Sequence, residues 1–450
     1  MTKVITYGTF DLFHEGHYRL LQRAKELGDY LIVGVTTENY DKTRGKLNVV
    51  DSLMTRIENV KKTGFADEVI IEESLGQKVS DVKKYKIDIF TVGSDWIGAF
   101  DYMSEYCKVV YLERTKNVSS TLLRNQNFKI QRIGIIGTGR IARRFLMEAK
   151  CVSGVNVQGV YNPHEESAKK FAENYGIDWF QTLDELYKKT EIVYVASPHG
   201  THYLYTKDAL EHEKHVICEK PFAMKKEQAE ELFQIAKRKR VILFEGIKTA
   251  YCPGFNRLVD IACSGLIGNI RYIDACFTKL EDKNSRELTD ETYGGSFTEL
   301  GSYCLLPVIK LFGCEYEDIR FESIYGQRKI DIFTKASMKF KKGFATITCG
   351  LGVKSEGRLL IAGTQGYIVA EAPWWKTTYF EVHFEDASRV EKYSERFLGD
   401  GLRYEISDFL YQINGNMNSE FKLTRGESIV MAEIMEKFLE GEHRDEDMGT

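Results

Sequence analysis

Two histidines in the stretch HEGH, residues 14–17, are the first residues in the chain whose types and spacing could do chemistry. They could bind a metal, pack in a core or contact phosphate, and the spacing alone leaves all three open. His14 and His17 come directly before a run with helical spacing, GHYRLLQRAKELG. Helix N-termini expose unpaired N–H groups and a partial positive charge, so this position favours anions. Both rings would then donate to phosphate oxygens.

A second group of phosphate-binding residue types lies in ERTKNVSSTLLR, residues 113–124. Ser119, Ser120 and Thr121 can cap a helix and donate hydroxyls to phosphate, and Arg114 offers a bidentate fork. An ordinary helix N-cap would explain the hydroxyls equally well. Together with HEGH, this stretch predicts a triphosphate site.

A glycine-rich loop in RIGIIGTGRIA has the spacing of a dinucleotide fingerprint. Gly137, Gly139 and Ala142 fit Gly-x-Gly-x-x-Ala between an apolar strand and a helix, so the backbone can approach a pyrophosphate. The next strand ends at Asn162, where an acidic residue usually reads the ribose of NAD. Asn162 could still bond a ribose hydroxyl, and no Arg follows it to hold a 2′-phosphate. The choice between NAD and NADP stays open.

Strands and helices that alternate along the chain must position these groups. Such alternation predicts a parallel sheet with helices packed on it. The alternation starts again at RIGIIG, which predicts a second domain. The joint at 125–131 is short and has no Pro or Gly, so we expect tight coupling. The strands expected before the joint are KVITYG, DYLIVGVTT, EVIIEE, DIFTVGS and KVVYLERT.

Composition excludes several classes of protein. The length of 450 residues, with 43% hydrophobic and 28% charged residues, is typical of a globular protein of two or three domains. The formal net charge of -4 gives no basic field, so we expect no nucleic-acid partner. No apolar run is long enough to cross a bilayer, and no signal peptide is visible, so we expect no membrane partner. The nine cysteines lack Cys-x-x-Cys spacing, which predicts reduced thiols and a cytoplasmic location.

Roughly the first 125 residues resemble the glycerol-3-phosphate cytidylyltransferase family. The resemblance rests on KVITYGTFDLFHEGHYRLLQRAKELGDYLIVGVTT, on GSDW at 93–96 and on RTKNVSST at 114–121. The family motifs are His-x-Gly-His and Arg-Thr-x-Gly-Ile-Ser-Thr-Thr. Asn117, Val118 and Ser120 depart from the second motif, and the pattern of Arg and hydroxyl residues remains.

This resemblance implies that a phosphate monoester attacks the α-phosphorus of CTP and expels pyrophosphate, a reaction carried by positioning and charge neutralisation. Mg2+ would bridge the triphosphate oxygens. A loop cation, Lys46 or alternatively Arg44, would reach the phosphates. The other residues implied are His14 and His17 on the α-phosphate, Thr9, Phe10 and Asp11 around the nucleotide, and Arg114, Ser119, Ser120 and Thr121 on the triphosphate.

Residues from about 130 to 450 resemble the glucose-fructose oxidoreductase and inositol dehydrogenase (Gfo/Idh/MocA) family. The stretches that carry this resemblance are IVYVASPHGTH, HVICEKPFAM and GGSFTELGSY. It implies a Rossmann domain that binds NAD(P)(H), followed by an α/β domain with an open, mostly antiparallel sheet. Glu219-Lys220-Pro221 matches the family signature, and we expect its Lys-Pro bond to be cis.

The second resemblance also implies roles for single residues. Lys220 would bond the reacting oxygen, and Glu299 lies four residues before Tyr303, as an acid does in the family motif. Tyr303 would donate a proton, with its pKa lowered by Lys220, unless it is a core aromatic. His199 and His202 would lie near the nicotinamide or be structural. Ala250 stands where the family often has an Arg, so we expect substrate recognition to differ.

The expected organisation is a Rossmann-like nucleotidyltransferase domain at 1–128, a Rossmann domain at 129–250 and a substrate and oligomerisation domain at 251–450. Since open sheets in such domains often pair, we expect a homo-oligomer. The predicted enzyme reduces a sugar phosphate to an alditol phosphate and couples it to CTP as a CDP-alditol, such as CDP-ribitol or a CDP-glycerol-like product, for surface polysaccharide synthesis. Alternatively, the oxidoreductase acts on a CDP-linked sugar, or the second part is a silent nucleotide-binding or assembly module.

Overall fold

The computed structural model describes residues 1–37, 40–41, 49, 51–74, 76–98, 100–113, 130–414 and 422–441. The chain divides into two compact units, Met1–Ile130 and Gln131–Thr450, and each is described by itself. Residues 125–129 of the expected joint lie outside the described residues, so its stiffness stays a prediction.

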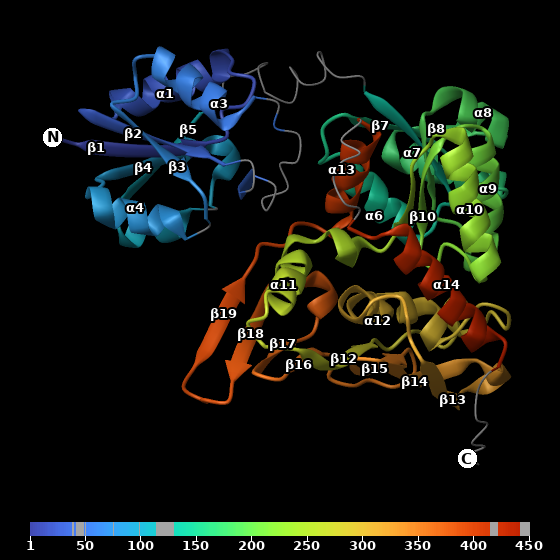
Figure 1. Cartoon of the computed structure of the whole chain (residues 1–450). Coiled ribbons are helices and arrows are strands. Elements are labelled where there is room, and N and C mark those ends of the chain that lie inside the picture. The colour runs from blue at the N-terminus through green and yellow to red at the C-terminus, as the bar shows by residue number, and fades with distance from the viewer. Residues whose placement is uncertain are drawn as a thin grey trace. The chain divides into compact units, whose positions relative to one another are not determined.

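The first unit is a parallel α/β fold (Figure 1). Its described residues form a five-stranded sheet in the order β3-β2-β1-β4-β5, and each neighbouring pair is parallel. The two central strands are apolar along their length because helices cover both faces. The elements are β1 (Lys3–Gly8), α1 (Glu15–Glu26), β2 (Tyr30–Thr36), α3 (Leu53–Lys62), β3 (Glu68–Glu72), α4 (Gln77–Tyr85), β4 (Ile89–Gly93), η1 (Ser94–Trp96), η2 (Asp101–Glu105) and β5 (Lys108–Leu112).

The second unit begins with a Rossmann sheet. Its described residues form six parallel strands in the order β11-β10-β9-β6-β7-β8. The strand order reverses beside β6, and ligands of such sheets bind at this switch point. The elements are β6 (Gln131–Ile136), α6 (Arg140–Ala149), β7 (Val155–Tyr161), α7 (Glu165–Tyr175), β8 (Asp178–Phe180), α8 (Leu183–Lys189), β9 (Ile192–Val195), η3 (His199–Thr201), α9 (His202–Glu211), β10 (His215–Glu219), α10 (Lys226–Lys239), β11 (Leu243–Gly246) and η4 (Lys248–Tyr251).

A larger sheet follows in the same unit. Its eight strands in the described residues run in the order β13-β14-β15-β12-β16-β17-β18-β19, with β12 and β15 parallel and the other pairs antiparallel. Both the parallel sheets and this open, mostly antiparallel sheet confirm the fold predicted from the sequence. The elements are α11 (Pro253–Cys263), β12 (Ile270–Thr278), η5 (Arg286–Leu288), α12 (Ser296–Phe312), β13 (Asp318–Tyr325), η6 (Gln327–Lys329), β14 (Asp331–Phe340), β15 (Gly343–Gly350), β16 (Leu359–Gly363), β17 (Gly366–Ala370), η7 (Trp374–Lys376), β18 (Tyr379–Phe384), β19 (Val390–Ser394), α13 (Leu402–Ile413) and α14 (Arg425–Leu439).

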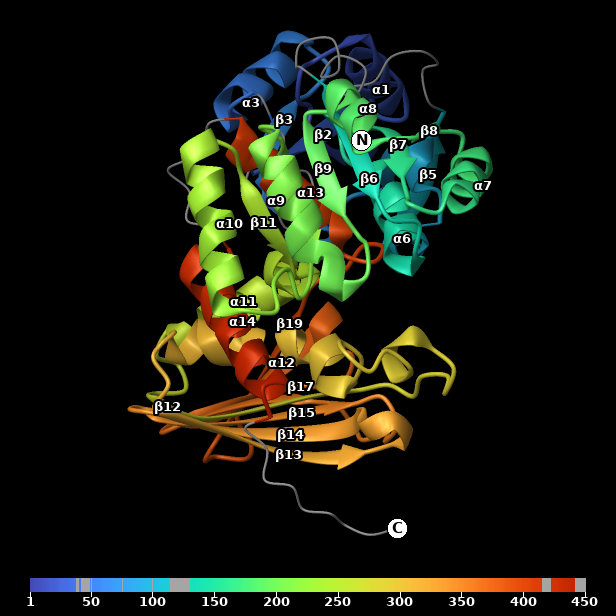
Figure 2. The same ribbon diagram turned by 90° about the vertical axis from the view of Figure 1, so that its right-hand side faces the viewer.

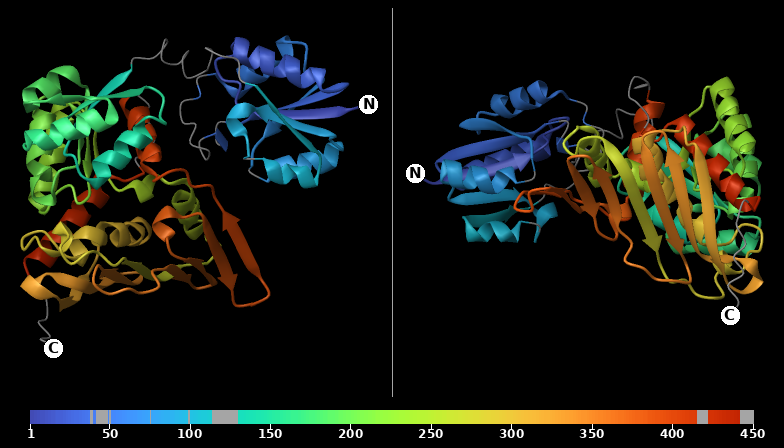
Figure 3. Two further views of the ribbon diagram at one scale, coloured as in Figure 1. Left: turned by 180° about the vertical axis from the view of Figure 1, so that it is seen from behind. Right: turned by 60° about the horizontal axis from the view of Figure 1, so that its bottom comes forward.

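Helix α12 lies between the two sheets of the second unit (Figure 2). It is apolar and almost wholly buried, because one side packs on β12, β14 and β15 while the other faces the Rossmann part. The right-hand view of Figure 3 looks at the opposite face of the eight-stranded sheet. Glu299 and Tyr303 lie on α12, so this helix carries two predicted site residues to the switch point.

The last two helices return to the Rossmann part. In α13, Arg403 pairs with Glu148 of α6 at 2.7 Å. In α14, a Glu436 carboxylate oxygen accepts from the Lys226 amide at the start of α10, at 2.9 Å. These contacts join the segments on either side of residue 250 into one compact body. Among the described residues, no helix combines the length and the apolar character that crossing a bilayer requires.

Candidate functional sites

The HEGH histidines lie at the start of α1, where the sequence places them. His14 is the N-cap, and its Nδ1 accepts from the Gly16 amide at 3.0 Å. In a neutral His14 ring the proton is therefore on Nε2. The rings of His14 and His17 stack with centroids 3.8 Å apart. The two imidazole rings thus lie stacked on each other at the N-terminal end of α1.

Thr9, Phe10 and Asp11 form the loop between β1 and α1. All three side chains are buried. The Thr9 hydroxyl donates to Asp41 at 2.9 Å, and an Asp11 carboxylate oxygen accepts from the Asp51 amide at 2.9 Å. These side chains thus fix the shape of the loop, and a direct contact between them and a nucleotide stays a prediction.

Sequence reasoning missed Arg56 in α3, which is fully buried behind this loop. Its guanidinium donates to the carbonyls of Thr9 at 2.9 Å and Thr36 at 2.7 Å. It also lies 3.7 Å from an Asp41 carboxylate oxygen. One signal for a buried arginine was available in the sequence. Arg56 lies on the helix face that also carries the apolar residues Ile57 and Val60, where a charged side chain is unusual.

The remaining predicted residues of this site cannot be placed. They lie outside the described residues, and their roles stay predictions: Arg44, Lys46, Arg114, Ser119, Ser120 and Thr121.

The glycine loop of the second unit joins β6 to α6. Gly137 has a φ of 108°, and a Cβ there would lie 2.4 Å from the Ala196 carbonyl oxygen, so this position requires glycine. Gly139 is different, because a Cβ there would meet nothing within 4 Å. The loop therefore leaves space beside the N-terminus of α6, which is what a pyrophosphate needs. Ala142 is buried in α6.

The Asn162 side chain, at the end of β7, is used within the protein. Its Nδ2 donates to the Thr138 hydroxyl at 2.8 Å, and its Oδ1 accepts from the His164 amide at 2.8 Å. The residue thus ties the end of β7 to the glycine loop. A contact with a ribose hydroxyl stays a prediction.

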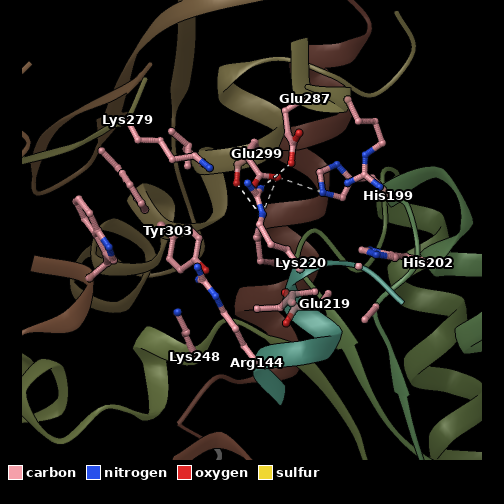
Figure 4. Close-up of a pocket in the computed structure, with 18 of the residues that line it drawn as sticks. Arg144, His199, His202, Glu219, Lys220, Lys248, Lys279, Glu287, Glu299 and Tyr303 are labelled. Atoms are coloured by element: carbon pink, nitrogen blue, oxygen red, sulfur yellow. Dashed lines mark hydrogen bonds and ion pairs between the residues drawn. The ribbon is translucent and has the colours of Figure 1, made fainter. Parts of the chain in front are cut away.

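Lys220, Glu299 and Tyr303 meet in one pocket, although the lysine and the carboxylate are 79 residues apart in the chain. The Lys220-Pro221 bond is cis, which confirms the prediction, and the Lys220 side chain points into the pocket (Figure 4). Lys220 Nζ donates to the Glu299 carbonyl at 2.9 Å and lies 3.2 Å from Glu299 Oε2. It is also 5.6 Å from the centre of the Tyr303 ring. The Glu299 side chain is therefore positioned to contact the Lys220 ammonium directly.

The charges of the pocket explain the pKa shifts of two groups. Burial opposes ionisation of Glu299, but Lys220 and His199 outweigh it and hold the pKa of that carboxyl well below its usual range. For Tyr303, burial and then Glu219 and Glu299 raise the pKa well above its usual value. The expectation that Lys220 lowers the pKa of Tyr303 is therefore wrong, because desolvation and the nearby carboxylates dominate.

The two histidines after β9 have different environments. His199 lines the pocket, with Nε2 3.4 Å from Glu299 Oε2. Both ring nitrogens of His202 face carbonyls, Nδ1 with Pro221 at 2.8 Å and Nε2 with Ser197 at 2.7 Å. Burial lowers the pKa of His202 to about 3, and a neutral ring can donate to only one of these carbonyls. His202 therefore ties the β9 loop to the Lys-Pro turn.

Glu219 lies at the base of the pocket, where Tyr194 donates a hydrogen bond to it at 2.5 Å. Burial raises the pKa of Glu219. The pocket has a volume of about 550 Å³, enough for small ligands. Its lining is rich in cations, which sequence reasoning did not identify beyond Lys220: Arg140, Arg144, Lys248, Lys279, Arg286 and Lys376.

Comparison with known proteins assigns both units. Residues 5–126 match the family described as cytidylyltransferase-like, and residues 131–247 match the oxidoreductase family with an NAD-binding Rossmann fold. The first unit belongs to the cytidylyltransferase-like family, and residues 131–247 of the second unit are a Gfo/Idh/MocA oxidoreductase domain. Glycerol-3-phosphate cytidylyltransferase of Bacillus spizizenii is 48% identical over 124 residues, which cover 28% of this chain and 95% of that protein. Both resemblances predicted from the sequence are confirmed.

Two further relatives match the oxidoreductase unit. The scyllo-inositol 2-dehydrogenase (NADP(+)) of Bacillus subtilis is 27% identical over 318 residues, covering 68% of this chain and 95% of that protein. The solved structure of KijD10, a 3-ketoreductase from Actinomadura kijaniata in complex with NADP and TDP-benzene, has a TM-score of 0.60 at 21% identity and covers 68% of this chain and 96% of that one. At that identity the likeness shows the fold. The chain is therefore an enzyme that joins a cytidylyltransferase to an oxidoreductase of the nicotinamide-binding type.

Proposed function

We propose that the chain reduces a sugar phosphate to an alditol phosphate and then couples it to CTP, releasing pyrophosphate and a CDP-alditol for surface polysaccharide synthesis. The observation that carries this proposal is the Lys220, Glu299 and Tyr303 constellation in a cation-rich pocket, in a chain whose other unit is a cytidylyltransferase. Ribulose 5-phosphate, giving CDP-ribitol, is the leading substrate, and a shorter sugar phosphate is the second.

The oxidoreductase residues suit reduction of a carbonyl. A bound nicotinamide supplies the hydride, and the Gly137–Gly139 loop has the space to hold the cofactor's pyrophosphate. The Lys220 ammonium donates to the carbonyl oxygen as negative charge develops on it. Tyr303 then gives its hydroxyl proton to that oxygen. The raised pKa of Tyr303 keeps the phenol protonated at neutral pH, as a proton donor requires.

Glu299 acts on Lys220, not on the substrate. Its carbonyl and carboxylate contacts fix the ammonium within the pocket. An ammonium carries three N–H donors, so the lysine can hold these two contacts and still donate to a substrate oxygen. Glu299 is therefore a positioning residue.

The cytidylyltransferase residues suit phosphate chemistry without a strong base. An oxygen of the alditol phosphate forms a bond to the α-phosphorus of CTP, and the bond to the pyrophosphate oxygen breaks. His14 and His17 donate to the α-phosphate at the start of α1, where the helix N–H groups add to the positive field. Among the described residues, no group of three or more His, Cys, Asp or Glu side chains could hold a metal. Mg2+ in nucleotide sites is usually held through substrate phosphates and one or two carboxylates, so we expect it to bridge the phosphate oxygens of CTP.

A second candidate is reduction of a CDP-linked sugar after the transfer. The observation that favours it is the TDP-benzene bound to KijD10, a protein with the same fold as the oxidoreductase unit. In this order the transferase acts first. The silent-module alternative is less well supported, because Lys220 and Tyr303 lie in one pocket.

A product assay on three proteins tests the proposal. The wild type, Lys220→Met and His17→Ala are each given CTP, NADH or NADPH, and either ribulose 5-phosphate or ribitol 5-phosphate. Lys220→Met should make CDP-ribitol from ribitol 5-phosphate only, and His17→Ala should accumulate ribitol 5-phosphate. Formation of CDP-ribitol from ribulose 5-phosphate by Lys220→Met at the wild-type rate contradicts the reductase assignment. If the wild type transfers hydride only to a CDP-linked sugar and not to ribulose 5-phosphate, cytidylyl transfer comes before reduction.

A further inference from the structure

One end of the oxidoreductase pocket collects three cations from separate elements. Lys248 lies in η4, Lys376 in η7 and Arg144 in the second turn of α6. Figure 4 shows Lys248 and Arg144 on the same side of Tyr303, while Lys279 lies on the other side. Lys248 is 5% exposed. We refer to Lys248, Lys376 and Arg144 as the cationic end of the pocket.

A hydrogen bond between η4 and η7 holds two of these cations together. The Thr249 hydroxyl donates to the Trp375 carbonyl at 2.9 Å, and each of these residues is the chain neighbour of a lysine of the cationic end. Trp375 stacks on Phe277 with ring centroids 3.5 Å apart, so the turn that carries Lys376 is fixed against the sheet. The two lysines are therefore built into the pocket wall.

The positive charge of the cationic end is only partly compensated. Asp400 Oδ1 lies 3.2 Å from Lys376 Nζ, and Asp400 Oδ2 lies 3.8 Å from Arg144 Nε. Within residues 130–414 and 422–441, the ammonium of Lys248 makes no hydrogen bond or ion pair. Burial, followed by the charge of Lys376, lowers the pKa of Lys248. Most of the Lys248 side chain is removed from water, which disfavours its charged form, and an anion beside it in the pocket would offset much of that cost.

We propose that Lys248, Lys376 and Arg144 bind the phosphate of a phosphomonoester substrate, while Lys220 and Tyr303 face its carbonyl. This inference rests on the proposed function, and it names the residues that select the phosphorylated sugar. Asp400 is the carboxylate that pairs with these cations, and burial raises the pKa of Glu219 and of Glu405, the other two carboxyls that act on Lys248. A phosphomonoester dianion would supply negative charge to all three cations at one point. The cofactor's pyrophosphate has its own place at the Gly139 end of α6, one helical turn before Arg144.

The first test compares phosphorylated and unphosphorylated substrates. Lys248→Met should lower kcat/KM for ribulose 5-phosphate by about 100-fold, as expected for a lost buried charge contact, and leave that for ribulose within about twofold. Lys376→Met, a change at a more exposed lysine, should lower the same ratio by about 10-fold. NAD(P)H affinity should not change in either variant. Lys392→Met is the matched control, since Lys392 is 65% exposed on β19, outside the pocket.

An equal loss with both sugars, or no loss with either, overturns the inference. A loss of NAD(P)H affinity would instead assign these cations to the cofactor, which also overturns it. If the wild type reduces a CDP-linked sugar but not the sugar phosphate, and Lys248→Met reduces the CDP-linked sugar at the same rate, these residues do not bind a substrate phosphate.

A second measurement separates this inference from the proposed function. Inorganic phosphate is titrated into the Trp96→Phe protein, in which all remaining tryptophans belong to the oxidoreductase unit and Trp375 lines the pocket. A saturable fluorescence change that Lys248→Met abolishes supports the phosphate site, even if no sugar phosphate is reduced and the proposed function fails. The same change in Lys248→Met and in the parent overturns the site, whatever the substrate proves to be.

Discussion

Replacement of Glu299 by Gln tests whether an ionised carboxylate holds the reductase lysine in place. Glu299 Oε2 lies 3.2 Å from Lys220 Nζ and 3.4 Å from His199 Nε2, and its side chain is 15% exposed. At an effective dielectric constant near 20, the attraction across the Lys220 contact is about 5 kcal/mol. Desolvation of both groups offsets part of it, and breaking a buried pair typically costs about 3 to 5 kcal/mol. Because Gln keeps the shape and one acceptor, we expect a loss of about 3 kcal/mol in the free energy of unfolding at pH 7.

The loss should depend on pH in a defined direction. The pKa of Glu299 in the folded protein is held below its ordinary value of 4.5, so the folded state favours the ionised form. Its contribution to stability is therefore complete above about pH 4.5 and is lost as the pH falls toward the folded-state pKa. The wild type loses this contribution on acidification and the Gln variant has none to lose. The difference between them should thus narrow below pH 4.5.

The assay is urea unfolding at pH 7 and at pH 3.5, followed by tryptophan fluorescence in the Trp96→Phe background. The same substitution at an exposed ion pair provides the control, because Glu391 pairs with Arg389 at 2.9 Å with side chains 35% and 53% exposed. Glu391→Gln should leave the free energy of unfolding nearly unchanged at both pH values, because solvent screens this exposed pair. An equal gap between wild type and Glu299→Gln at both pH values would refute the electrostatic reasoning and leave a packing effect in its place.

Three other predictions follow from the geometry. Gly139→Ala should fold normally, because the added Cβ meets nothing within 4 Å, but fluorescence titration should show NAD(P)H binding weakened about 10-fold. Gly137→Ala should also destabilise the unit, because its φ of 108° is strained for alanine and the added Cβ would clash with the Ala196 carbonyl oxygen. Arg56→Leu should destabilise the first unit by about 3 kcal/mol, measured by urea unfolding followed by Trp96 fluorescence in a protein whose other three tryptophans are replaced by Phe, and a loss below about 1 kcal/mol would contradict the buried network. His17→Ala should slow pyrophosphate release from CTP by about a hundredfold and leave NAD(P)H oxidation intact, and wild-type release would exclude the phosphate role.

Local sequence was sufficient for features that depend on near neighbours. The strand and helix periodicities predicted both parallel sheets, because apolar spacing reports which face an element buries. His14 was expected at a helix N-terminus, and it caps α1 through an amide two residues away. The Gly-x-Gly spacing predicted the turn at Gly137, whereas the cis Lys220-Pro221 bond was predicted from the resemblance to the oxidoreductase family and not from local sequence alone. These features are set within a few residues of chain.

Only the tertiary structure decided features that depend on distant segments. Glu299 meets Lys220 across 79 residues, and Asp400 approaches Lys376 from a loop before α13. The pKa of Tyr303 was predicted in the wrong direction because one neighbouring cation was considered, whereas burial and several carboxylates act on the phenol together. Desolvation is a sum over every atom that excludes water, and those atoms come from both sheets. The motifs alone therefore determined which chemical groups the protein has, and folding determined their charge environment.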